Sequence, residues 1–542
     1  MTGPTWEKKA EIKRAAAAAK IPSDWRLPSP ILEEISQGTL QNVLDVSRQS
    51  GILSDQELLI TETTDATALL EKLAAREFSA VDVATAFCKR AAIAQQLTCC
   101  LTETFFDIAL ARAKQLDDHF IATGTPVGPL HGLPISLKES FNVKGVSTSL
   151  GFISFLDHPP KSTNSALVDI LLAAGAVLYV KTNVPQTLMS ADSHNNVFGR
   201  TLNPHCLSLG AGGSSGGEGA LIAQRGSILG VGTDVAGSIR IPSLCCGIVG
   251  FKPSVGRVPY SGQTSSSRRG IAGIAPVAGP LGHSVRDIEL FLKVVANSHP
   301  DDLDDQAMAI PWREPQAQSV LTVGILPEDP SRPLHPCMQR TLLTAAESLR
   351  SAGHHVVEMS GKVPSLSTAG RLSFRLLNMD PDQTTLGHVA RGEEPRVPSL
   401  SVTFDPNSTD PEPTLRELYD LTAKRQDMVA QMREIYVENK LDVILAPAYQ
   451  SCAVPHDLYG TPLYTVLANL LDYPAITIPF GQANEARDAE YVRDVPYEPP
   501  YQPKLVEGAP CHIQLIGRRL QEEALVQQSK VVEAILQKQS LS

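Results

Sequence analysis

The chain contains 542 residues, of which 42% are hydrophobic and 19% charged, and its formal net charge is −11. This composition is typical of a soluble globular protein with a large apolar core, and it excludes a chain that is disordered throughout. The negative charge argues against a general affinity for nucleic acid, because such binding depends on a basic surface that displaces counterions from phosphates. We therefore expect an acidic enzyme of small-molecule metabolism.

The nine cysteines form an odd, scattered set that fits neither a disulfide framework nor the paired spacing of a zinc site. The N-terminal segment is charged and rich in alanine and lacks the apolar stretch of a secretory signal. Nowhere does the chain approach the run of about 20 apolar residues that crosses a bilayer. These features predict a cytoplasmic protein with no membrane span. The sequence leaves the oligomeric state open between a monomer and a homodimer. No metal or organic cofactor is expected, since no histidine stands in a pattern such as HExxH.

Residues 1–62 are expected to form a helical extension, and two amphipathic helices follow it. In the first, from Asp65 to Arg76, leucines recur at helical spacing. The second is preceded by Ser79 and Asp82, which have the spacing of a capping box.

From about residue 130 onward, helices and strands are expected to alternate. One helix should end at Gly175 and be followed by a buried strand at 176–180. A long amphipathic helix is expected between Leu415 and Lys440. Further strands of the same sheet are predicted by the apolar runs VLTVGIL, HHVVEM, LDVILAPA, AITIPF and HIQLIG.

Three polar or proline-rich stretches, near residues 300, 405 and 490, are expected to be surface loops. At about 150 residues per domain, the length alone would suggest three or four domains. Strands continue on both sides of each loop, however. We therefore expect one α/β domain over residues 63–542, with a mixed, twisted central β-sheet covered by α-helices.

The densest chemical signal is the run GAGGSSGGEGA at residues 210–220, which leads into a helical pattern. So many glycines imply tight turns whose N–H groups lie beside a helix N-terminus, where an anion can bind. The run lacks GxxxxGK[ST], and it fails GxGxxG because Ser215 replaces the last glycine. It does contain GxSxG, which alone would make Ser214 the nucleophile of an α/β-hydrolase. As an isolated feature, the run would also fit a flexible turn.

A second serine, Ser238, follows in VGTDVAGSIRIP, where small residues allow the backbone to fold sharply and to present successive N–H groups to a developing oxyanion. The N–H groups expected there are those of Val235, Ala236, Gly237 and Ser238. Asp234 and Arg240 flank the segment. We expect them to form a buried ion pair that fixes the loop, because arginine stays protonated and is a poor acid or base.

These segments together resemble the signature of the amidase signature family, through the run GGSSGGEGALIAQRGSILGVGTDVAGSIRIPS at residues 212–243. The family's lysine motif is matched upstream by GPLHGLPISLKESFNVKG, which contains Lys138. Other segments from about residue 65 to about residue 530 are similar, and the N-terminal opening resembles that of fungal members. The resemblance implies the amidase signature fold and hydrolysis of a carboxamide C–N bond to a carboxylic acid and ammonia or an amine.

On the matching residues, the resemblance implies that Ser238 forms the acyl-enzyme, Ser214 is a bridging serine held by a cis peptide bond, and Lys138 is the base. Ser215 would support the bridge. This chemistry is reasonable, because a serine hydroxyl needs an adjacent base and a lysine serves as one only when its surroundings lower its pKa. The segment ISLKESF places an apolar strand, hydroxyls and one acid, Glu139, around the lysine.

The sequence leaves three points open. The resemblance assigns Leu188 and Met189 to the substrate channel, although plain core packing would explain them equally well. Many relatives carry glycine where Ala236 stands, and alanine keeps the N–H while restricting φ. The small-molecule amide itself is not specified, and short aliphatic, aryl, peptide and lipid amides all fit.

Two other functions are compatible with parts of the sequence. One is the A subunit of a tRNA-dependent amidotransferase, against which the acidic balance and the fungal-type extension count. The other is a non-catalytic binding protein on the amidase scaffold, against which the intact Lys138, Ser214 and Ser238 count.

Overall fold

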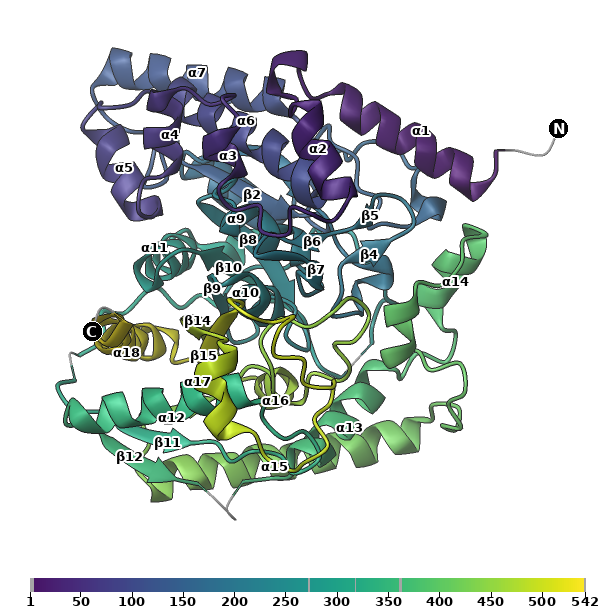
Figure 1. The fold of residues 1–542 in the computed structure, drawn as a ribbon, viewed down its shortest axis with the longest axis vertical. Coiled ribbons are helices and arrows are strands. Elements are labelled where there is room, and N and C mark those ends of the chain that lie inside the picture. Colours follow the sequence, from purple (N-terminus) through teal and green to yellow (C-terminus); the bar gives the residue numbers. More distant parts are fainter. Residues whose placement is uncertain (1–3, 272, 317, 360–362, 541–542) are drawn as a thin grey trace.

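An eleven-stranded mixed β-sheet runs through the centre of the computed structural model, which describes residues 4–271, 273–316, 318–359 and 363–540 (Figure 1). Neighbouring strands are parallel in the β3-β2-β8 and β13-β11-β12 parts of the sheet and antiparallel elsewhere. In sheet order the strands are β1 (Leu101–Thr104), β3 (Val177–Thr182), β2 (Pro134–Lys138), β8 (Leu229–Asp234), β10 (Val277–Gly282), β9 (Val249–Lys252), β14 (Ala475–Gln482), β15 (Pro510–Ile516), β13 (Val443–Ala446), β11 (Thr322–Ile325) and β12 (His355–Glu358).

The five late apolar runs predicted to be strands of one sheet are confirmed as β11 to β15 of this sheet. Four further strands form two separate pairs near the glycine-rich run. They are β4 (His194–Asn195) with β5 (Gly199–Arg200), and β6 (Leu202–Asn203) with β7 (Cys206–Gly210).

The N-terminal residues are helical as expected and lie across the upper part of the molecule in Figure 1, packed against the rest of the chain. The Arg14 guanidinium donates to the carbonyl of Val197 at 2.9 Å, and Lys20 pairs with Glu103 at 3.2 Å. The domain boundary near residue 62 stays a prediction. The elements of this segment are α1 (Trp6–Ala19), η1 (Ser23–Trp25), α2 (Ser29–Ser36), α3 (Val46–Gln49) and α4 (Asp55–Thr61).

The two amphipathic helices that follow are confirmed, and each begins at a side-chain cap, of which the sequence predicted the second. Asp65 accepts from the N–H of Ala68 at 2.9 Å at the start of α5 (Ala66–Ala74). Ser79 and Asp82 form a complete capping box before α6 (Ala80–Thr98). A side-chain cap of this kind satisfies backbone N–H groups that have no partner within the helix.

The other helices cover the two faces of the sheet (Figure 1). The long helix predicted after residue 415 is α15, and the chain between α8 and β3 turns at Gly175, where φ is +96°. The helices are α7 (Phe106–Thr123), α8 (Ala166–Ala173), α9 (Gly216–Ala223), α10 (Arg240–Cys246), α11 (Val285–Ala296), α12 (Pro336–Ser351), α13 (Leu366–Leu377), α14 (Thr384–Arg391), α15 (Leu415–Glu438), α16 (Leu463–Leu471), α17 (Glu485–Asp488) and α18 (Glu522–Ser540).

Two of the three stretches expected to be loops, those near residues 300 and 490, contain short helical segments. Near residue 490 the chain forms α17 and then the 3₁₀ turn η6 (Ala489–Tyr491). The side chain of Asn484 accepts from the N–H of Arg487 at 3.0 Å and so caps α17. The prolines and charges of this stretch favour a loop, but the local cap at Asn484 stabilises a short helix. Other 3₁₀ turns are η2 (Ile153–Phe155), η3 (Gln186–Leu188), η4 (Pro300–Asp302) and η5 (Pro398–Val402).

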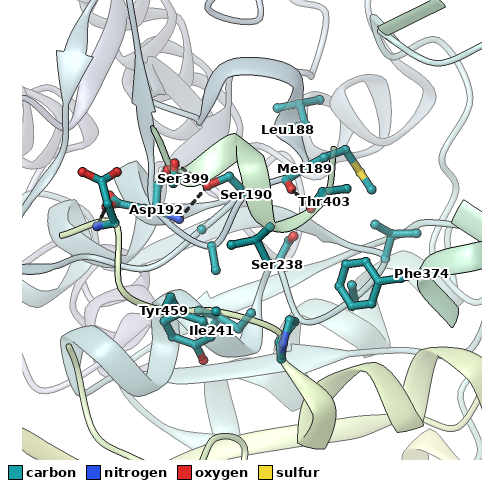
Figure 2. A pocket seen from close by; sticks show the side chains of 18 residues that line it. Leu188, Met189, Ser190, Asp192, Ser238, Ile241, Phe374, Ser399, Thr403 and Tyr459 are labelled. Atoms are coloured by element: carbon teal, nitrogen blue, oxygen red, sulfur yellow. Dashed lines mark hydrogen bonds between the residues drawn. The ribbon is translucent and has the colours of Figure 1, made fainter. Parts of the chain in front are cut away.

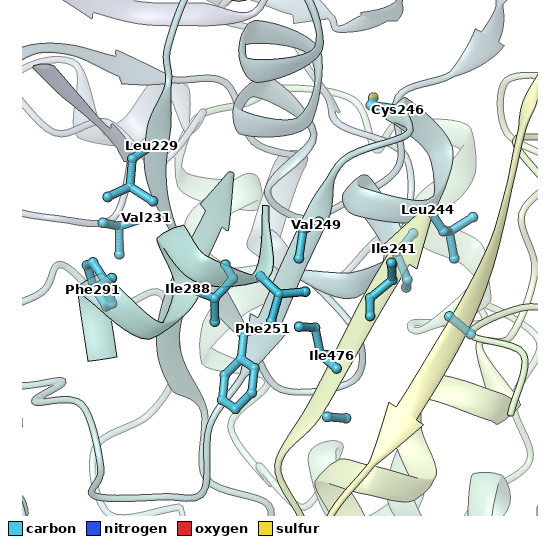
Figure 3. Packing of buried hydrophobic residues seen from close by; sticks show 14 of the residues in the cluster. Leu229, Val231, Ile241, Leu244, Cys246, Val249, Phe251, Ile288, Phe291 and Ile476 are labelled. Carbon is cyan, nitrogen blue, oxygen red and sulfur yellow. The ribbon is translucent and has the colours of Figure 1, made fainter. Parts of the chain in front are cut away.

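The two faces of β8 have different surroundings, and this difference positions the site. Leu229 and Val231 belong to one continuous cluster of buried apolar side chains that includes Ile288 and Phe291 of α11 (Figure 3). The opposite face carries glycine at position 230, against which Glu218, the one polar side chain of α9, and Ser136 of β2 pack. Burial of each large apolar side chain favours folding by about 1.5–3 kcal/mol, so the first face anchors the strand while the second accommodates polar groups.

Candidate active site

The predicted lysine and one predicted serine are in contact at the carboxyl ends of two adjacent parallel strands. Lys138 is the last residue of β2, and its Nζ donates to Ser214 Oγ at 2.6 Å and to Thr233 Oγ1 at 2.8 Å. Thr233 lies near the end of β8, which runs parallel to β2. Ser214 lies in the turn before α9 and follows a cis Gly213–Ser214 peptide bond.

Lys138 is completely buried, and burial lowers the pKa of its amine to about 7, against the opposing influence of Asp234 and Glu218. A substantial fraction of the side chain is therefore the neutral amine near pH 7, and only the neutral amine has a lone pair that can accept a proton. When the amine is neutral, the Ser214 hydroxyl can donate to this lone pair across the same 2.6 Å contact.

Glu139, the acid that follows Lys138 in the sequence, belongs to a different cluster. Its carboxylate pairs with Lys181 at 3.3 Å, and both side chains are completely buried. It also accepts from the N–H of Ser149 at 2.7 Å. The expectation that Glu139 is the acid beside Lys138 is therefore wrong, because successive residues of a strand point to opposite faces.

Ser238 lies in the turn between β8 and α10, on the wall of a pocket, where Figure 2 shows it between the polar side chains around Asp192 and the apolar group around Phe374. The N–H of Ser215 donates to the carbonyl of Ser238 at 3.1 Å. The turn that carries Ser214 and the turn that carries Ser238 are therefore joined through their backbones.

The four N–H groups expected to face an oxyanion differ in their present partners. That of Gly237 already donates to Asp234 Oδ1 at 2.8 Å. Those of Val235, Ala236 and Ser238 form no hydrogen bond with another group in the described part of the chain. The turn thus has three donors without an intramolecular partner beside the hydroxyl of Ser238.

Asp234 and Arg240 form an ion pair with both side chains completely buried, Arg240 Nη2 lying 3.1 Å from Asp234 Oδ1. Burial acts to raise the pKa of Asp234, but the charge and hydrogen bonds of Arg240 outweigh it and hold the pKa at about 2. The guanidinium also donates to Gln514 Oε1 and Asn469 Oδ1, each at 2.7 Å. The pair connects the Ser238 turn to α16 and β15, and so fixes its position.

The pocket beside Ser238 has a volume of about 550 Å³, part of it open to solvent. Leu188 and Met189 both line it, which favours the channel assignment, and Leu188 also packs against the buried cluster that contains Phe152. The other lining residues are Ser190, Ala191, Asp192, Gly213, Val235, Ala236, Ser238, Ile241, Phe374, Ser399, Val402, Thr403, Asp457, Tyr459, Gly460 and Pro462.

Several of these residues were not identified from the sequence. Phe374, Val402 and Tyr459 come from segments with no recognisable motif, and only the tertiary fold brings them to Ser238. Two residues within the identified motifs were also missed. Thr233 contacts Lys138, and Glu218 is a buried carboxyl on α9. The sequence did hold a signal for Glu218, since it is the one charged residue in the run GAGGSSGGEGALIA.

Across residues 4–271, 273–316, 318–359 and 363–540, no group of three or more histidine, cysteine or acidic side chains is arranged to hold a metal ion. Within the same residues, no helix has the length and apolar character that a membrane crossing requires.

Fold and site together define a hydrolytic enzyme of a known class. The family model described as Amidase matches residues 82–526, and the chain belongs to this family, the amidase signature enzymes. It is 40% identical over 529 residues to an amidase of Gibberella moniliformis, covering 97% of this chain and 98% of that protein. It is 38% identical over 541 residues to an acetamidase of Emericella nidulans, covering 96% of each.

A solved structure with the same fold is a fatty acid amide hydrolase, which superimposes with a TM-score of 0.91 at 33% identity and covers 98% of this chain and 95% of that one. A bacterial aryl acylamidase of the amidase signature family matches with a TM-score of 0.72 at 21% identity, covering 87% of this chain and 96% of that one. The second likeness concerns the fold alone.

Proposed function

We propose that this amidase cleaves a small-molecule carboxamide to a carboxylic acid and ammonia or an amine, through an acyl-enzyme on Ser238. The observation that carries the proposal is the 2.6 Å contact between the buried amine of Lys138 and the hydroxyl of Ser214. A serine beside a lysine of lowered pKa can relay a proton, which a lysine exposed to water cannot accept near neutral pH.

In the proposed reaction, Ser238 Oγ attacks the carbonyl carbon while its proton passes to Ser214 Oγ and the proton of Ser214 passes to Lys138 Nζ. The oxyanion that forms accepts hydrogen bonds from the N–H groups of Val235, Ala236 and Ser238. When the C–N bond breaks, the leaving nitrogen takes a proton back from Lys138 through Ser214. Water then attacks the acyl carbon and loses a proton to the same pair. As the bond between the acyl carbon and Ser238 Oγ breaks, the pair returns this proton to Ser238 Oγ, and the carboxylic acid is released.

The pocket favours hydrolysis over the role of an amidotransferase A subunit. Such a subunit takes glutamine, whose α-carboxylate needs a cationic partner. The described residues that line this pocket include Asp192 and Asp457 but neither lysine nor arginine. Most of the lining is apolar, which suits an amide without a carboxylate.

The test is covalent labelling with a fluorophosphonate, followed by peptide mass spectrometry. We expect the adduct on Ser238 and a complete loss of amidase activity. A protein that takes no label would be a binding protein on the amidase scaffold. A panel of neutral amides of increasing acyl length, with glutamine as the charged comparison, then measures pocket shape through kcat/KM. Preference for glutamine would support the amidotransferase instead.

A further inference from the structure

Residues 186–190, which we call the channel segment, have a backbone conformation that L-amino acids rarely adopt. Thr187 has φ +73° and Leu188 has φ +65°, so two consecutive residues with a Cβ lie in the left-handed region. A β-branched residue such as threonine is a clear outlier there, because its side chain crowds the backbone. Such a conformation persists only where surrounding groups hold it. The channel segment includes Leu188 and Met189, which line the pocket beside Ser238.

One end of the channel segment is held by Gln186, whose side chain is completely buried. Its Nε2 donates to Glu394 Oε2 at 2.9 Å and to the carbonyl of Pro395 at 3.1 Å. Its Oε1 accepts from the N–H of Val397 at 3.0 Å. The amide group just before the left-handed pair is therefore bonded, through both its nitrogen and its oxygen, to one short stretch of chain.

The other end of the channel segment is held by two hydroxyl contacts with the same part of the chain, residues 394–403, which we call the clamp segment. Thr403 Oγ1 donates to the carbonyl of Met189 at 2.5 Å, and Ser190 Oγ donates to Ser399 Oγ at 2.8 Å. Figure 2 shows both pairs side by side on the wall of the pocket. The clamp segment thus holds the channel segment on both sides of the left-handed pair.

Glu394 anchors the clamp segment to the rest of the fold. It is buried, and its carboxyl group accepts from three uncharged donors, one of which is Gln186. The N–H of Ile153 donates to Oε1 and Asn196 Nδ2 donates to Oε2, each at 2.9 Å. Asn196 Nδ2 also donates to the carbonyl of Pro395 at 2.7 Å. Glu394 is not among the described residues that line the pocket, so it does not contact a substrate bound there.

The proposed catalytic residues belong to other elements. Lys138 ends β2, Ser214 precedes α9 and Ser238 precedes α10. Within the described residues, none of the three forms a hydrogen bond with the channel segment. A change in residues 186–189 therefore alters the wall of the pocket without breaking the contact between the lysine and Ser214.

We propose, on the basis of the amidase function proposed above, that the clamp segment determines selectivity for the apolar group of the amide and that Glu394 is its positioning residue. By holding Thr187 and Leu188 in the left-handed region, the clamp segment fixes the side chains of Leu188 and Met189 in the pocket wall. A fixed wall discriminates between groups that differ by one methylene, whereas a wall that moves accepts several. Glu394 acts through the channel segment and touches neither the substrate nor the reacting atoms.

The test measures kcat/KM for neutral amides of increasing acyl length in the wild type and in Glu394→Gln. Glutamine keeps the shape but replaces one carboxyl oxygen by an NH₂ group, which cannot accept, so at least one of the three bonds is lost. We expect the ratio of kcat/KM between the best and the worst amide to fall by about 3- to 10-fold, a part of the discrimination that one methylene gives in an apolar pocket. A substitution that only lowers stability reduces all rates alike and leaves this ratio unchanged.

Amide hydrogen exchange of the peptide that contains residues 186–190 tests the clamp segment without a substrate. Exchange should be faster in Glu394→Gln than in the wild type, because a released segment opens more often. Asp287→Asn is the matched control, since Asp287 is another buried acid, on α11, and accepts from the N–H groups of Ala66 and Thr67. This control should change neither the exchange of the peptide nor the ratio.

Thr187→Gly provides a second measurement, because glycine adopts a positive φ without a steric cost. Alone, it should keep the ratio within about 2-fold of the wild type. Combined with Glu394→Gln, it should restore part of the lost ratio, since the left-handed conformation then needs less support. An equal loss of the ratio in Glu394→Gln and in the double variant would overturn the inference, because the clamp segment would then not act against strain at Thr187.

If Glu394→Gln fails to fold, Thr403→Val takes its place. Valine has nearly the size of threonine but removes the donor to the carbonyl of Met189. Faster exchange of residues 186–190 together with a smaller ratio supports the inference. A ratio within about 2-fold of the wild type overturns it, whatever the exchange.

Failure of the proposed function has a different signature. In that case the wild type neither hydrolyses the amides nor takes a fluorophosphonate label on Ser238, and hydrogen exchange still decides whether the clamp segment holds the channel segment. If the wild type and Glu394→Gln are both labelled on Ser238 and both active, and the ratio is the same in the two, only the inference about the clamp segment is wrong.

Discussion

The N–H of Ser215 donates to the carbonyl oxygen of Ser238 at 3.1 Å and so joins the two turns that carry the proposed catalytic serines. This bond involves only backbone atoms. Alanine at position 214 or 238 therefore removes a hydroxyl and leaves the connection between the turns in place. A change of activity in these variants is thus expected to reflect the loss of the hydroxyl rather than a displacement of the turn.

Ser238→Ala should abolish formation of the acyl-enzyme, whereas Ser214→Ala should leave slow turnover. Loss of the attacking atom removes the covalent route, while loss of the bridge impairs proton transfer by a factor of about 10² to 10⁴. Rapid-quench mass spectrometry of the intact protein with a slow amide measures both. An acyl adduct trapped on Ser238→Ala would show that another residue is the nucleophile.

The pH dependence of kcat/KM should rise through one apparent pKa near the value of about 7 that burial gives Lys138, and then level off. The direction follows because the neutral amine is the active form and accumulates above its pKa. Lys138→Arg should be almost inactive at every pH, since guanidinium stays protonated. Lys138→Ala should lose the limb and keep a trace of activity. A near-wild-type rate in Lys138→Ala would exclude the lysine as base.

Much of this site was predictable from the sequence because its residues lie in continuous motifs. The segments around Lys138, Ser214 and Ser238 have fixed spacings, and their small residues already indicate sharp turns with available N–H groups. The later strands were predictable for a similar reason. Runs such as AITIPF are apolar on both faces, as buried strands of a covered sheet are.

The remaining features depend on contacts between distant segments. Phe374 on α13 and Tyr459 in the loop before α16 reach the pocket through tertiary contacts, which no local sequence pattern predicts. Glu139 was placed beside Lys138 by sequence proximity, but the alternation of a strand directs it to Lys181. The engagement of the Gly237 N–H by Asp234 likewise follows from the geometry of the folded turn.

Arg240→Met should destabilise the protein by about 3–5 kcal/mol, because it leaves the buried carboxylate of Asp234 without its ionic partner. The double variant Asp234→Asn with Arg240→Met should be more stable than the single one, since no uncompensated charge is left in the interior. Urea denaturation of the wild type and both variants measures the free energies of unfolding. A single variant within about 1 kcal/mol of the wild type would mean that the pair does not hold the turn.

Gly237→Ala should lower kcat/KM by about 10²- to 10³-fold, the loss expected when an oxyanion turn is displaced. Two observations support this. The φ of Gly237 is +124°, which residues with a Cβ rarely adopt, and an added Cβ would lie 2.7 Å from the Cβ of Thr465. Thr465 Oγ1 in turn donates to the carbonyl of Ala236 at 2.8 Å, so displacement of Thr465 also disturbs the neighbouring peptide.

Gly353→Ala is the matched control for this substitution. Gly353 follows α12 with φ +91°, and an added Cβ there would meet nothing within 4 Å. Both variants carry the backbone cost of a positive φ, about 1–2 kcal/mol, and only Gly237→Ala adds a steric clash beside Ser238. The Tm should therefore fall in both variants, while kcat/KM should fall in Gly237→Ala alone. Equal activity in the two variants would show that the Ser238 turn tolerates displacement and that its N–H groups do not hold the oxyanion.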